Sequence, residues 1–326
     1  MDFRTPVSIP RDESIALSPT SNVMLVGSCF ADHIGQMLQN ALPSRQIRVN
    51  PNGTLYNPLS ICRCISSLLA DEAERGIDKD GYFVTTTGEW RHWDYATAFS
   101  APTREELEGK LMETWENTKE VMKRLDLLFV TLSTDHVYQL VSEQGSRGRI
   151  VANCHKQPSR MFDERVADTD VTYEAWRQMI ELLKGMRLEV KVVFTLSPYR
   201  YAKYGMHENA LSKARLLLLI DKLEKAYPKD VCYFPAYEII NDELRDYRFY
   251  AEDMLHPSDQ AVAYVWERFS EWIFTPSMHE YAKERMALVR ALEHRPLHPG
   301  SEEYQCFLQR TEEKRLAFER KWKQAF

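Results

Sequence analysis

The segment LDLLFVTLS, residues 125–133, constrains the fold more than any other feature, because it is apolar almost throughout. Such runs occur in strands that are buried on both faces, as in parallel sheets covered by helices. Amphipathic helical patterns alternate with this run and with further short apolar runs at 22–26, 47–50, 189–196 and 231–234. The alternation predicts an α/β fold with four or five parallel strands flanked by helices. Functional groups in such folds lie at the carboxyl ends of the strands.

Two segments break this alternation in the first half of the chain. Residues 81–95 alternate apolar and polar side chains around TTGE, which predicts a hairpin. Residues 136–154 indicate a second hairpin, which turns at Gly145–Gly148. Neither segment has the continuous apolar character of the sheet strands.

The pattern changes again after Pro276. Two helical patterns, at 277–293 and 302–326, flank the loop HRPLHPGS, and the last helix is highly charged. We therefore predict a core domain over residues 1–275 and a C-terminal helical extension over residues 276–326 that packs on the core.

The composition narrows the classes of partner. The chain has 326 residues, a net charge of −6 and an isoelectric point near 5.9, so bulk attraction to nucleic acid or to anionic membranes is not expected. No apolar stretch approaches the ~18 residues of a membrane span, and the first residues lack the pattern of a secretory signal. The six cysteines are scattered, which argues against a disulfide framework. We expect a soluble, cytoplasmic protein with neither nucleic-acid nor membrane partners.

The stretch VMLVGSCFADHIGQML, residues 23–38, passes from a strand-like run into an amphipathic helix at Gly27. Glycine permits a sharp turn, and Ser28 and Cys29 then stand at the helix N-terminus. Backbone N–H groups at a helix N-terminus stabilise an oxyanion or a thiolate. The stretch is equally compatible with a plain turn, in which Ser28 caps the helix and Cys29 is a small buried apolar residue. The motif alone leaves both interpretations open.

A second group of reactive side chains lies in AEDMLHPS, where Asp253 precedes His256 by three residues. One short turn brings such a carboxylate to the imidazole, orients the ring and stabilises its charged form. The alternative is an Asp that caps a turn and a His on the surface. A catalytic pair requires this loop and the Gly27 turn to meet at one edge of the sheet.

Two further loops carry polar groups of lower specificity. The loop PNGTLYNP supplies Gly53, whose N–H is a candidate oxyanion donor, and VANCHKQPSR supplies Asn153 and His155 as candidate substrate-binding residues. Ordinary turn chemistry explains such Asn-containing pairs as well. The cysteines and histidines lack zinc-site spacing, and the glycine patterns of phosphate-binding loops are absent. We therefore expect neither a metal nor a cofactor.

Taken together, these residues resemble the GSCFA domain family, which is placed in the SGNH/GDSL hydrolase superfamily. The motif Gly27-Ser28-Cys29-Phe30-Ala31 carries the resemblance, with the stretches NPNGTLYNP, NCHKQP, YFPAYEIINDELRDYRFYAEDMLHPS and HRPLHP. The resemblance covers roughly residues 3–300. It implies a flavodoxin-like three-layer α/β/α sandwich that hydrolyses esters through a nucleophile after the first strand.

The same resemblance implies a role for each site residue. His256 is the base and Asp253 orients it. The oxyanion donors are the N–H of the nucleophile, the N–H of Gly53 and an Asn after the third strand. That strand ends in TLSTDH, which lacks the Asn, and Asn153 of the hairpin is a candidate replacement.

The identity of the nucleophile depends on the register of the overlay. Superfamily members read Gly-Asp-Ser-Leu, with the nucleophile second after the glycine. An ungapped overlay on GSCF places Cys29 there, and a shift of one residue restores Ser28. We favour Cys29, because a cysteine at a helix N-terminus beside a histidine gains thiolate character.

The expected activity is hydrolysis of an acyl ester on a small molecule or a carbohydrate, in the manner of an O-acyl or acetyl esterase. Acyl transfer to a carbohydrate hydroxyl is the alternative reaction. The alternative from another class is a non-catalytic binding protein that keeps the fold and uses its charged C-terminal helices for partners. Tyr199, Tyr201 and Tyr204 are candidates to line a sugar or acyl pocket, although core packing explains aromatic residues equally well. The sequence does not fix the oligomeric state.

Overall fold

Five parallel strands form the central sheet, in the spatial order β10-β9-β5-β1-β2. They are β1 (Val23–Gly27), β2 (Ile47–Val49), β5 (Leu127–Leu132), β9 (Lys191–Leu196) and β10 (Val231–Phe234). Numbered along the chain within this sheet, the strand order is 2-1-3-4-5, which is the flavodoxin-like order. The computed structural model describes residues 5–11, 13–72, 76–141, 145–187, 189–294, 296 and 300–323.

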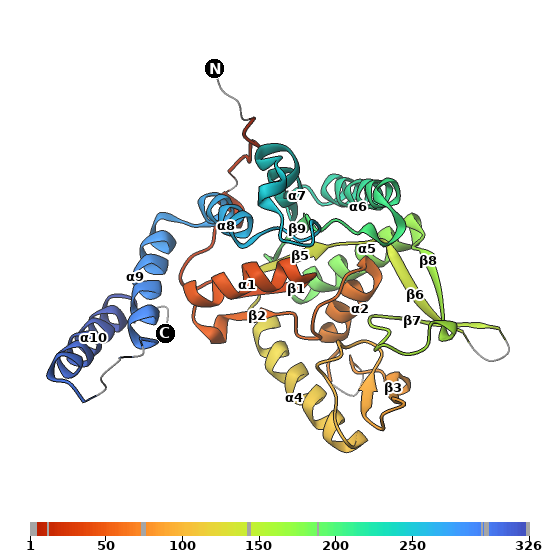
Figure 1. Ribbon diagram of the computed structural model, residues 1–326, viewed down its shortest axis with the longest axis horizontal. Helices are drawn as coiled ribbons and strands as arrows, with labels where there is room; N and C mark the ends of the chain where they lie inside the picture. Colours follow the sequence, from red (N-terminus) through yellow and green to blue (C-terminus); the bar gives the residue numbers. More distant parts are fainter. Residues whose placement is uncertain are drawn as a thin grey trace.

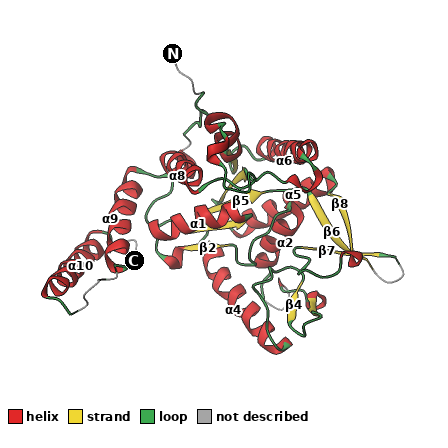
Figure 2. Ribbon diagram, viewed as in Figure 1, coloured by secondary structure: helices red, strands yellow, loops and turns green. Residues whose placement is uncertain are grey.

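Side chains of the central strands alternate between two apolar cores, one on each face of the sheet. In β1, Met24 and Val26 belong to the core formed with α2 (Pro58–Leu69), α4 (Arg104–Met122), α5 (Thr169–Met186) and α6 (Met206–Ala226). Val23 and Leu25 belong to the opposite core, formed with α1 (Cys29–Ala41), α8 (Asp259–Ile273) and α9 (Pro276–Leu292). Burial on both faces explains the unbroken apolar runs. Helices cover the strands as outer layers (Figure 1), and Figure 2 shows the same arrangement by element type, so the predicted three-layer α/β/α fold is confirmed.

Two small antiparallel sheets lie outside the main sheet. The first is the hairpin of β3 (Tyr82–Val84) and β4 (Trp90–His92), as predicted for residues 81–95. The second has three strands, in the order β7-β6-β8, where β6 spans His136–Val141, β7 Arg147–Val151 and β8 Phe162–Val166. The prediction of a turn at Gly145–Gly148 is wrong at its second half, because β7 already begins at Arg147. Residues 142–144 of this connection lie outside the described residues.

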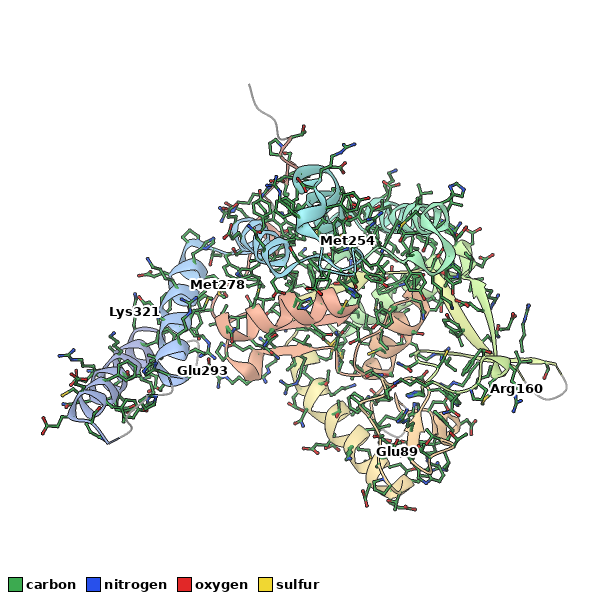
Figure 3. All side chains as sticks on the ribbon, in the orientation of Figure 1. Glu89, Arg160, Met254, Met278, Glu293 and Lys321 are labelled. Atoms are coloured by element: carbon green, nitrogen blue, oxygen red, sulfur yellow. The ribbon has the colours of Figure 1, made fainter. Side chains whose placement is uncertain are left out.

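The C-terminal helices α9 and α10 (Glu302–Lys321) extend from one side of the core. Figure 3 labels Met278 and Glu293 near the two ends of α9 and Lys321 at the end of α10. The two helices pack together through Tyr281, whose ring contacts Phe318 at a centroid distance of 5.1 Å. None of the helices in the described residues is long and apolar enough to cross a membrane.

An N-terminal arm, residues 5–11 and 13–21, runs along the second half of α8. Leu17 pairs with Phe274, and its N–H donates to Ile273 O at 2.7 Å. Further towards the N-terminus, Arg268 of α8 donates to the carbonyl oxygen of Val7 at 2.7 Å. The arm is therefore fastened at both ends to a helix that lies more than two hundred residues later in the chain.

Candidate active site

Gly27 ends β1 in a backbone conformation that other residues rarely adopt, with a φ of +143°. A Cβ atom here would lie 2.2 Å from the carbonyl oxygen of Thr131 on the neighbouring strand β5, so only glycine fits. The Gly27 N–H donates to Asn50 Oδ1 at 2.8 Å, and its carbonyl oxygen accepts from Leu55 N–H at 2.8 Å. The turn after β1 is therefore fixed by β5 on one side and by the loop after β2 on the other.

This turn gives Ser28 and Cys29 opposite environments. Ser28 is completely buried, and its N–H donates to Thr131 O at 3.2 Å. The Ser28 hydroxyl does not cap α1 and has no hydrogen-bond partner within the described part of the chain. Cys29 is the first residue of α1 and is partly exposed. The thiol, rather than the hydroxyl, is thus the side chain that a ligand can reach.

The surroundings of the Cys29 thiol raise its pKa above the ordinary value. Burial is the largest cause and the Asp32 carboxylate adds to it, while the N–H groups of Cys29 and Phe30 and the charge of Lys213 act in the opposite direction. The sequence led us to expect thiolate character at this helix N-terminus, but desolvation outweighs the favourable N–H groups. Cys29 is therefore a neutral thiol at neutral pH and needs a base to become a nucleophile.

Asp32, in the first turn of α1, holds the loop that follows β2. Asn50 Nδ2 donates to one carboxylate oxygen at 2.6 Å, and Thr54 Oγ1 donates to the other at 3.0 Å. In this loop the Gly53 N–H donates to Asn50 O at 2.7 Å, so it is not free to act as the oxyanion donor expected from the sequence. Gly53 has a φ of +77°, and a Cβ there would lie 2.3 Å from Ala96 Cβ. Turn geometry and close packing account for this glycine.

Asp253 and His256 are paired by hydrogen bonds in the loop before α8. Asp253 Oδ2 lies 2.5 Å from His256 Nδ1, while Oδ1 accepts the backbone N–H groups of Leu255 at 2.9 Å and His256 at 3.0 Å. Met254, which Figure 3 labels, has a left-handed φ of +59° that allows this tight turn. The backbone N–H and ring of His256, with the Leu255 N–H, lower the pKa of Asp253 to about 2. Because Nδ1–H faces Asp253, Nε2 of the neutral ring is left to accept a proton.

Tyr199 packs on this pair. Its ring centroid lies 4.4 Å from that of His256. Burial raises the pKa of Tyr199, and Tyr201, Asp253 and Cys29 add to the shift, so its phenol is within electrostatic reach of both loops. Tyr199 follows the carboxyl end of β9, and the two loops therefore meet at the same edge of the sheet.

Lys213 of α6 lies buried beneath this edge and was not identified from the sequence. Its ammonium group donates to the carbonyl oxygens of Ser133 at 2.7 Å and Ser197 at 2.8 Å, just beyond the ends of β5 and β9. Burial lowers the pKa of Lys213 to about 7, against the opposite effects of Asp135 and Cys29. The lysine joins two strand ends and places a titratable charge near the thiol. A lysine on the apolar face of an amphipathic helix is the signal that the sequence offered.

Tyr199, Tyr201 and Tyr204 form a row of rings beside His256, which we call the tyrosine row. The centroid distances are 6.0 Å between the first and second rings and 5.6 Å between the second and third. The row ends on His136 of β6, whose ring stacks on Tyr204 at 4.1 Å. All three tyrosines are half-buried rather than part of the core. They form an aromatic surface that leads away from His256.

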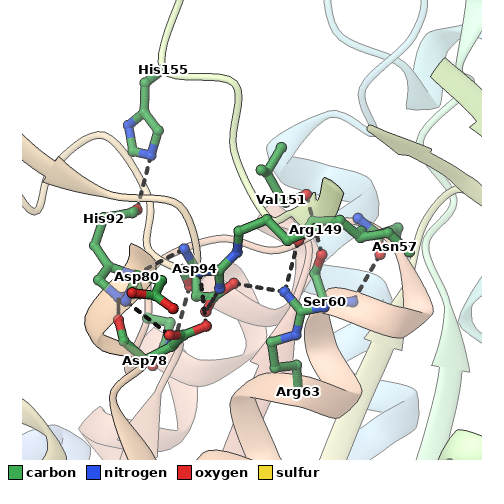
Figure 4. A network of polar contacts seen from close by, with 12 residues as sticks. Asn57, Ser60, Arg63, Asp78, Asp80, His92, Asp94, Arg149, Val151 and His155 are labelled. Atoms are coloured by element: carbon green, nitrogen blue, oxygen red, sulfur yellow. Dashed lines mark hydrogen bonds and ion pairs between the residues drawn. The ribbon is translucent and has the colours of Figure 1, made fainter. Parts of the chain in front are cut away.

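His155 is held within the packing of the β3–β4 hairpin. Its Nε2 donates to His92 O at 3.1 Å, as Figure 4 shows, and its ring packs against Phe83 and Trp93. His155 is 2% exposed, and burial lowers its pKa to about 4. The side-chain oxygen of Asn153 accepts the His155 N–H at 2.7 Å. Neither the His155 ring nor this oxygen is presented to a ligand, contrary to the substrate-binding role expected from the sequence.

The rest of the network in Figure 4 joins the hairpin region to α2 and β7. Asp94 accepts hydrogen bonds from Arg63 of α2 at 3.0 Å and from Arg149 of β7 at 2.5 Å, so one carboxylate ties the hairpin loop to two other elements. Across the described residues, no group of three or more His, Cys, Asp or Glu side chains could hold a metal ion.

Comparison with known proteins identifies the family. Residues 22–269 match the GSCFA family, and residues 286–325 match the GSCFA domain protein, C-terminal domain. The first match covers well over half of the chain, so the protein belongs to the GSCFA family, as its motifs indicated. The matched region includes the Gly27 turn and the Asp253–His256 loop. No curated protein matched the chain.

Proposed function

We propose that the protein is an acyl-ester hydrolase of the SGNH/GDSL type, with Cys29 as nucleophile, His256 as base and Asp253 as the residue that orients His256. The observation that carries the proposal is the hydrogen-bonded Asp253–His256 pair, whose neighbour Tyr199 follows β9 at the sheet edge where the partly exposed thiol begins α1. The flavodoxin-like strand order supports it, because these groups gather at the carboxyl ends of the strands.

In the first half of the proposed reaction, His256 Nε2 takes the thiol proton as the Cys29 sulfur attacks the ester carbonyl carbon. The new C–S bond turns the carbonyl oxygen into an oxyanion. The N–H groups of Cys29 and Phe30, which already favour negative charge on the sulfur, are the proposed donors to this oxyanion. When the ester C–O bond breaks, His256 gives the proton to the departing alkoxide and an alcohol leaves.

In the second half, water attacks the thioester while His256 accepts one of its protons. The C–S bond breaks, the sulfur recovers the proton from His256, and a carboxylic acid leaves. The raised pKa of Cys29 is compatible with this sequence, because the base acts at the moment of attack rather than before it. Ser28 is the weaker candidate, since it is fully buried.

Acyl transfer to a carbohydrate hydroxyl is the second candidate reaction. The tyrosine row favours it, because aromatic faces beside the base offer a surface on which a sugar ring can lie. The chemistry is the same up to the thioester, and an acceptor hydroxyl then takes the place of water.

Single variants compared on 4-nitrophenyl acetate and on acetylated sugars test the proposal. We expect Cys29→Ala and His256→Ala to lose hydrolysis, while Ser28→Ala keeps most of it and Cys232→Ala, at a half-exposed cysteine of β10, serves as the control. Mass spectrometry of the wild type should find a transient acetyl group on the peptide that contains Cys29. Loss in Ser28→Ala with activity in Cys29→Ala would reverse the assignment. A wild type that turns over no ester across a broad panel would favour the binding-protein alternative.

A further inference from the structure

A cavity of about 220 Å³ lies beside the Asp253–His256 loop and has no part in the reaction described above. Its polar lining consists of Arg200, Asn241, Arg245, Asp246, Tyr247 and Tyr250. The cavity and the loop share a wall. Arg200 N–H donates to Leu255 O at 3.0 Å, and Tyr250 forms an isolated bridge with Pro257, the residue after His256. A group bound in this cavity would therefore lie next to the proposed base.

Arg200 is held in place from three sides. Its guanidinium carbon lies 5.6 Å from the ring centroid of Tyr247 and 5.4 Å from that of Tyr250, and Nη1 lies 3.4 Å from Met254 O. Within the described residues, no carboxylate forms an ion pair with this guanidinium. An arginine fixed over aromatic faces is pre-organised to bind an anion, because little side-chain entropy remains to be lost.

Arg245 is the second arginine of the cavity lining and has an unusual backbone conformation. It follows the π-helix Ile239–Leu244, donates its N–H to Ile240 O at 3.1 Å and has a left-handed φ of +38°. Single π turns and left-handed residues other than glycine concentrate at functional sites, since their conformational cost is retained only for a reason. The conformation directs the chain so that Arg245 lines the same cavity as Arg200.

Asp246, the acidic residue of the lining, is engaged elsewhere. Its Oδ1 accepts the N–H of Arg248 at 3.0 Å, and its Oδ2 lies 3.2 Å from Arg248 Nε. Arg248 does not line the cavity. The carboxylate therefore offsets the two cavity guanidinium groups only in part, and the cavity keeps a positive character.

We propose that this cavity is a subsite for an anionic group, a carboxylate or a phosphate, carried by the alcohol part of the ester substrate. The proposal rests on the proposed function, because it assumes that the ester reacts at His256. The planar guanidinium groups of Arg200 and Arg245 match both anions, while Tyr247 and Tyr250 provide faces for an adjoining ring. A volume of about 220 Å³ suits one charged group and part of a ring rather than a whole substrate. The substrate class is then an acylated acidic sugar, either a uronate or a sugar phosphate.

Paired substrates test the subsite by a ratio. Kinetics on 4-acetoxybenzoate and the neutral 4-acetoxybenzamide give the preference for the anionic ester as a ratio of kcat/KM. An O-acetylated glucuronate and an O-acetylated glucose phosphate then separate the two anion sources. We expect a ratio of about ten or more in the wild type, a ratio near one in Arg245→Gln, and an unchanged ratio in Arg310→Gln, at an exposed arginine of α10 outside the cavity. A ratio near one in the wild type, or an equal ratio in Arg245→Gln, would overturn the subsite while hydrolysis itself stands.

A binding measurement separates this proposal from the proposed function. The anionic 4-acetamidobenzoate and the neutral 4-acetamidobenzamide contain no ester bond, and their Kd values on the full-length wild type and Arg245→Gln are measured by calorimetry. Tighter binding of the anionic compound, lost in Arg245→Gln, supports the subsite even if no ester is hydrolysed. Equal Kd values for the two compounds reject it.

Discussion

The ring of Tyr199 lies 4.4 Å from the ring of His256, and the same tyrosine is within electrostatic reach of the Cys29 thiol. This contact joins the loop that precedes the last core helix to the segment that follows β9. The proposed base is itself nearly half exposed, at 46% of its side chain, so the tyrosine ring is a main restraint on its orientation besides Asp253.

Replacement of Tyr199 should therefore lower the rate rather than the affinity. We expect Tyr199→Ala to reduce kcat on an aryl acetate by about 10- to 100-fold with little change in KM, because a misplaced base loses near-attack geometry. Tyr199→Phe keeps the ring contact and should restore most of the rate. Steady-state kinetics of the two variants check this, and equal losses in both would assign the role to the hydroxyl instead.

The raised pKa of Cys29 predicts low thiol reactivity in the resting protein. At pH 7, iodoacetamide should label Cys29 more slowly than the exposed Cys306 of α10, and labelling of Cys29 should increase as the pH rises through the alkaline range. Peptide mass spectrometry after timed labelling gives both rates. Faster labelling of Cys29 at pH 7 would mean that the thiolate is already present and that His256 need not act as a base for attack.

The lowered pKa of Lys213 should make the stability of the protein depend on pH. Its folded pKa of about 7 lies below the ordinary 10.5, so between these values the unfolded chain binds a proton that the folded chain does not. The free energy of unfolding should therefore rise with pH across this window by a few kcal/mol from this residue. Lys213→Met removes that contribution, and its stability should fall behind the wild type progressively from pH 7 to pH 10.

Urea denaturation at three pH values measures the Lys213 effect. Lys222→Met, at an exposed lysine of the same helix, is the matched control and should follow the wild type at every pH. If the Lys213→Met and wild-type curves stay parallel between pH 7 and pH 10, the buried lysine does not lose its proton in this range.

Replacement of Gly27 by alanine should cause a large loss of folding stability. In Gly27→Ala, the new methyl group would meet Thr131 O at 2.2 Å in a backbone conformation that alanine rarely adopts, so we expect a loss of about 2–4 kcal/mol. Gly109→Ala, in the middle of α4 with no heavy atom within 4 Å, should instead be stabilising by about 0.5–1 kcal/mol. Denaturant unfolding of the two variants gives the comparison, and similar values for both would show that the turn relaxes.

The central fold was predictable from the sequence, because strands buried on both faces are apolar almost throughout, as in residues 125–133. Strand β8 was missed because FDERV is polar and half-exposed, which gives it neither an apolar run nor a clear alternation. The pairing of Asp253 with His256 was predictable for a similar reason, since a separation of three residues makes it a property of one local turn.

Features of the site that depend on distant segments were not predictable. The Gly53 N–H already donates a hydrogen bond, because Asn50, with a left-handed φ of +43°, turns its carbonyl oxygen towards it. The amino-acid sequence gives no signal of that backbone conformation. The Cys29 pKa depends on how much of the fold covers the thiol. Lys213 and Tyr199 come from segments far along the chain. Only the strand order brings both side chains within electrostatic reach of the Cys29 thiol.

The N-terminal arm has a consequence for synthesis of the chain. Its Leu17 carbonyl accepts from Thr275, which is 258 residues away. At the ribosomal rate of about 5–20 residues per second, roughly 13–50 s pass between the synthesis of Leu17 and the synthesis of Thr275. During that interval the apolar surface that α8 will cover, including the inner side chains of the arm, stands open in the nascent chain. The last core helix and the arm must therefore close the domain together, late in translation.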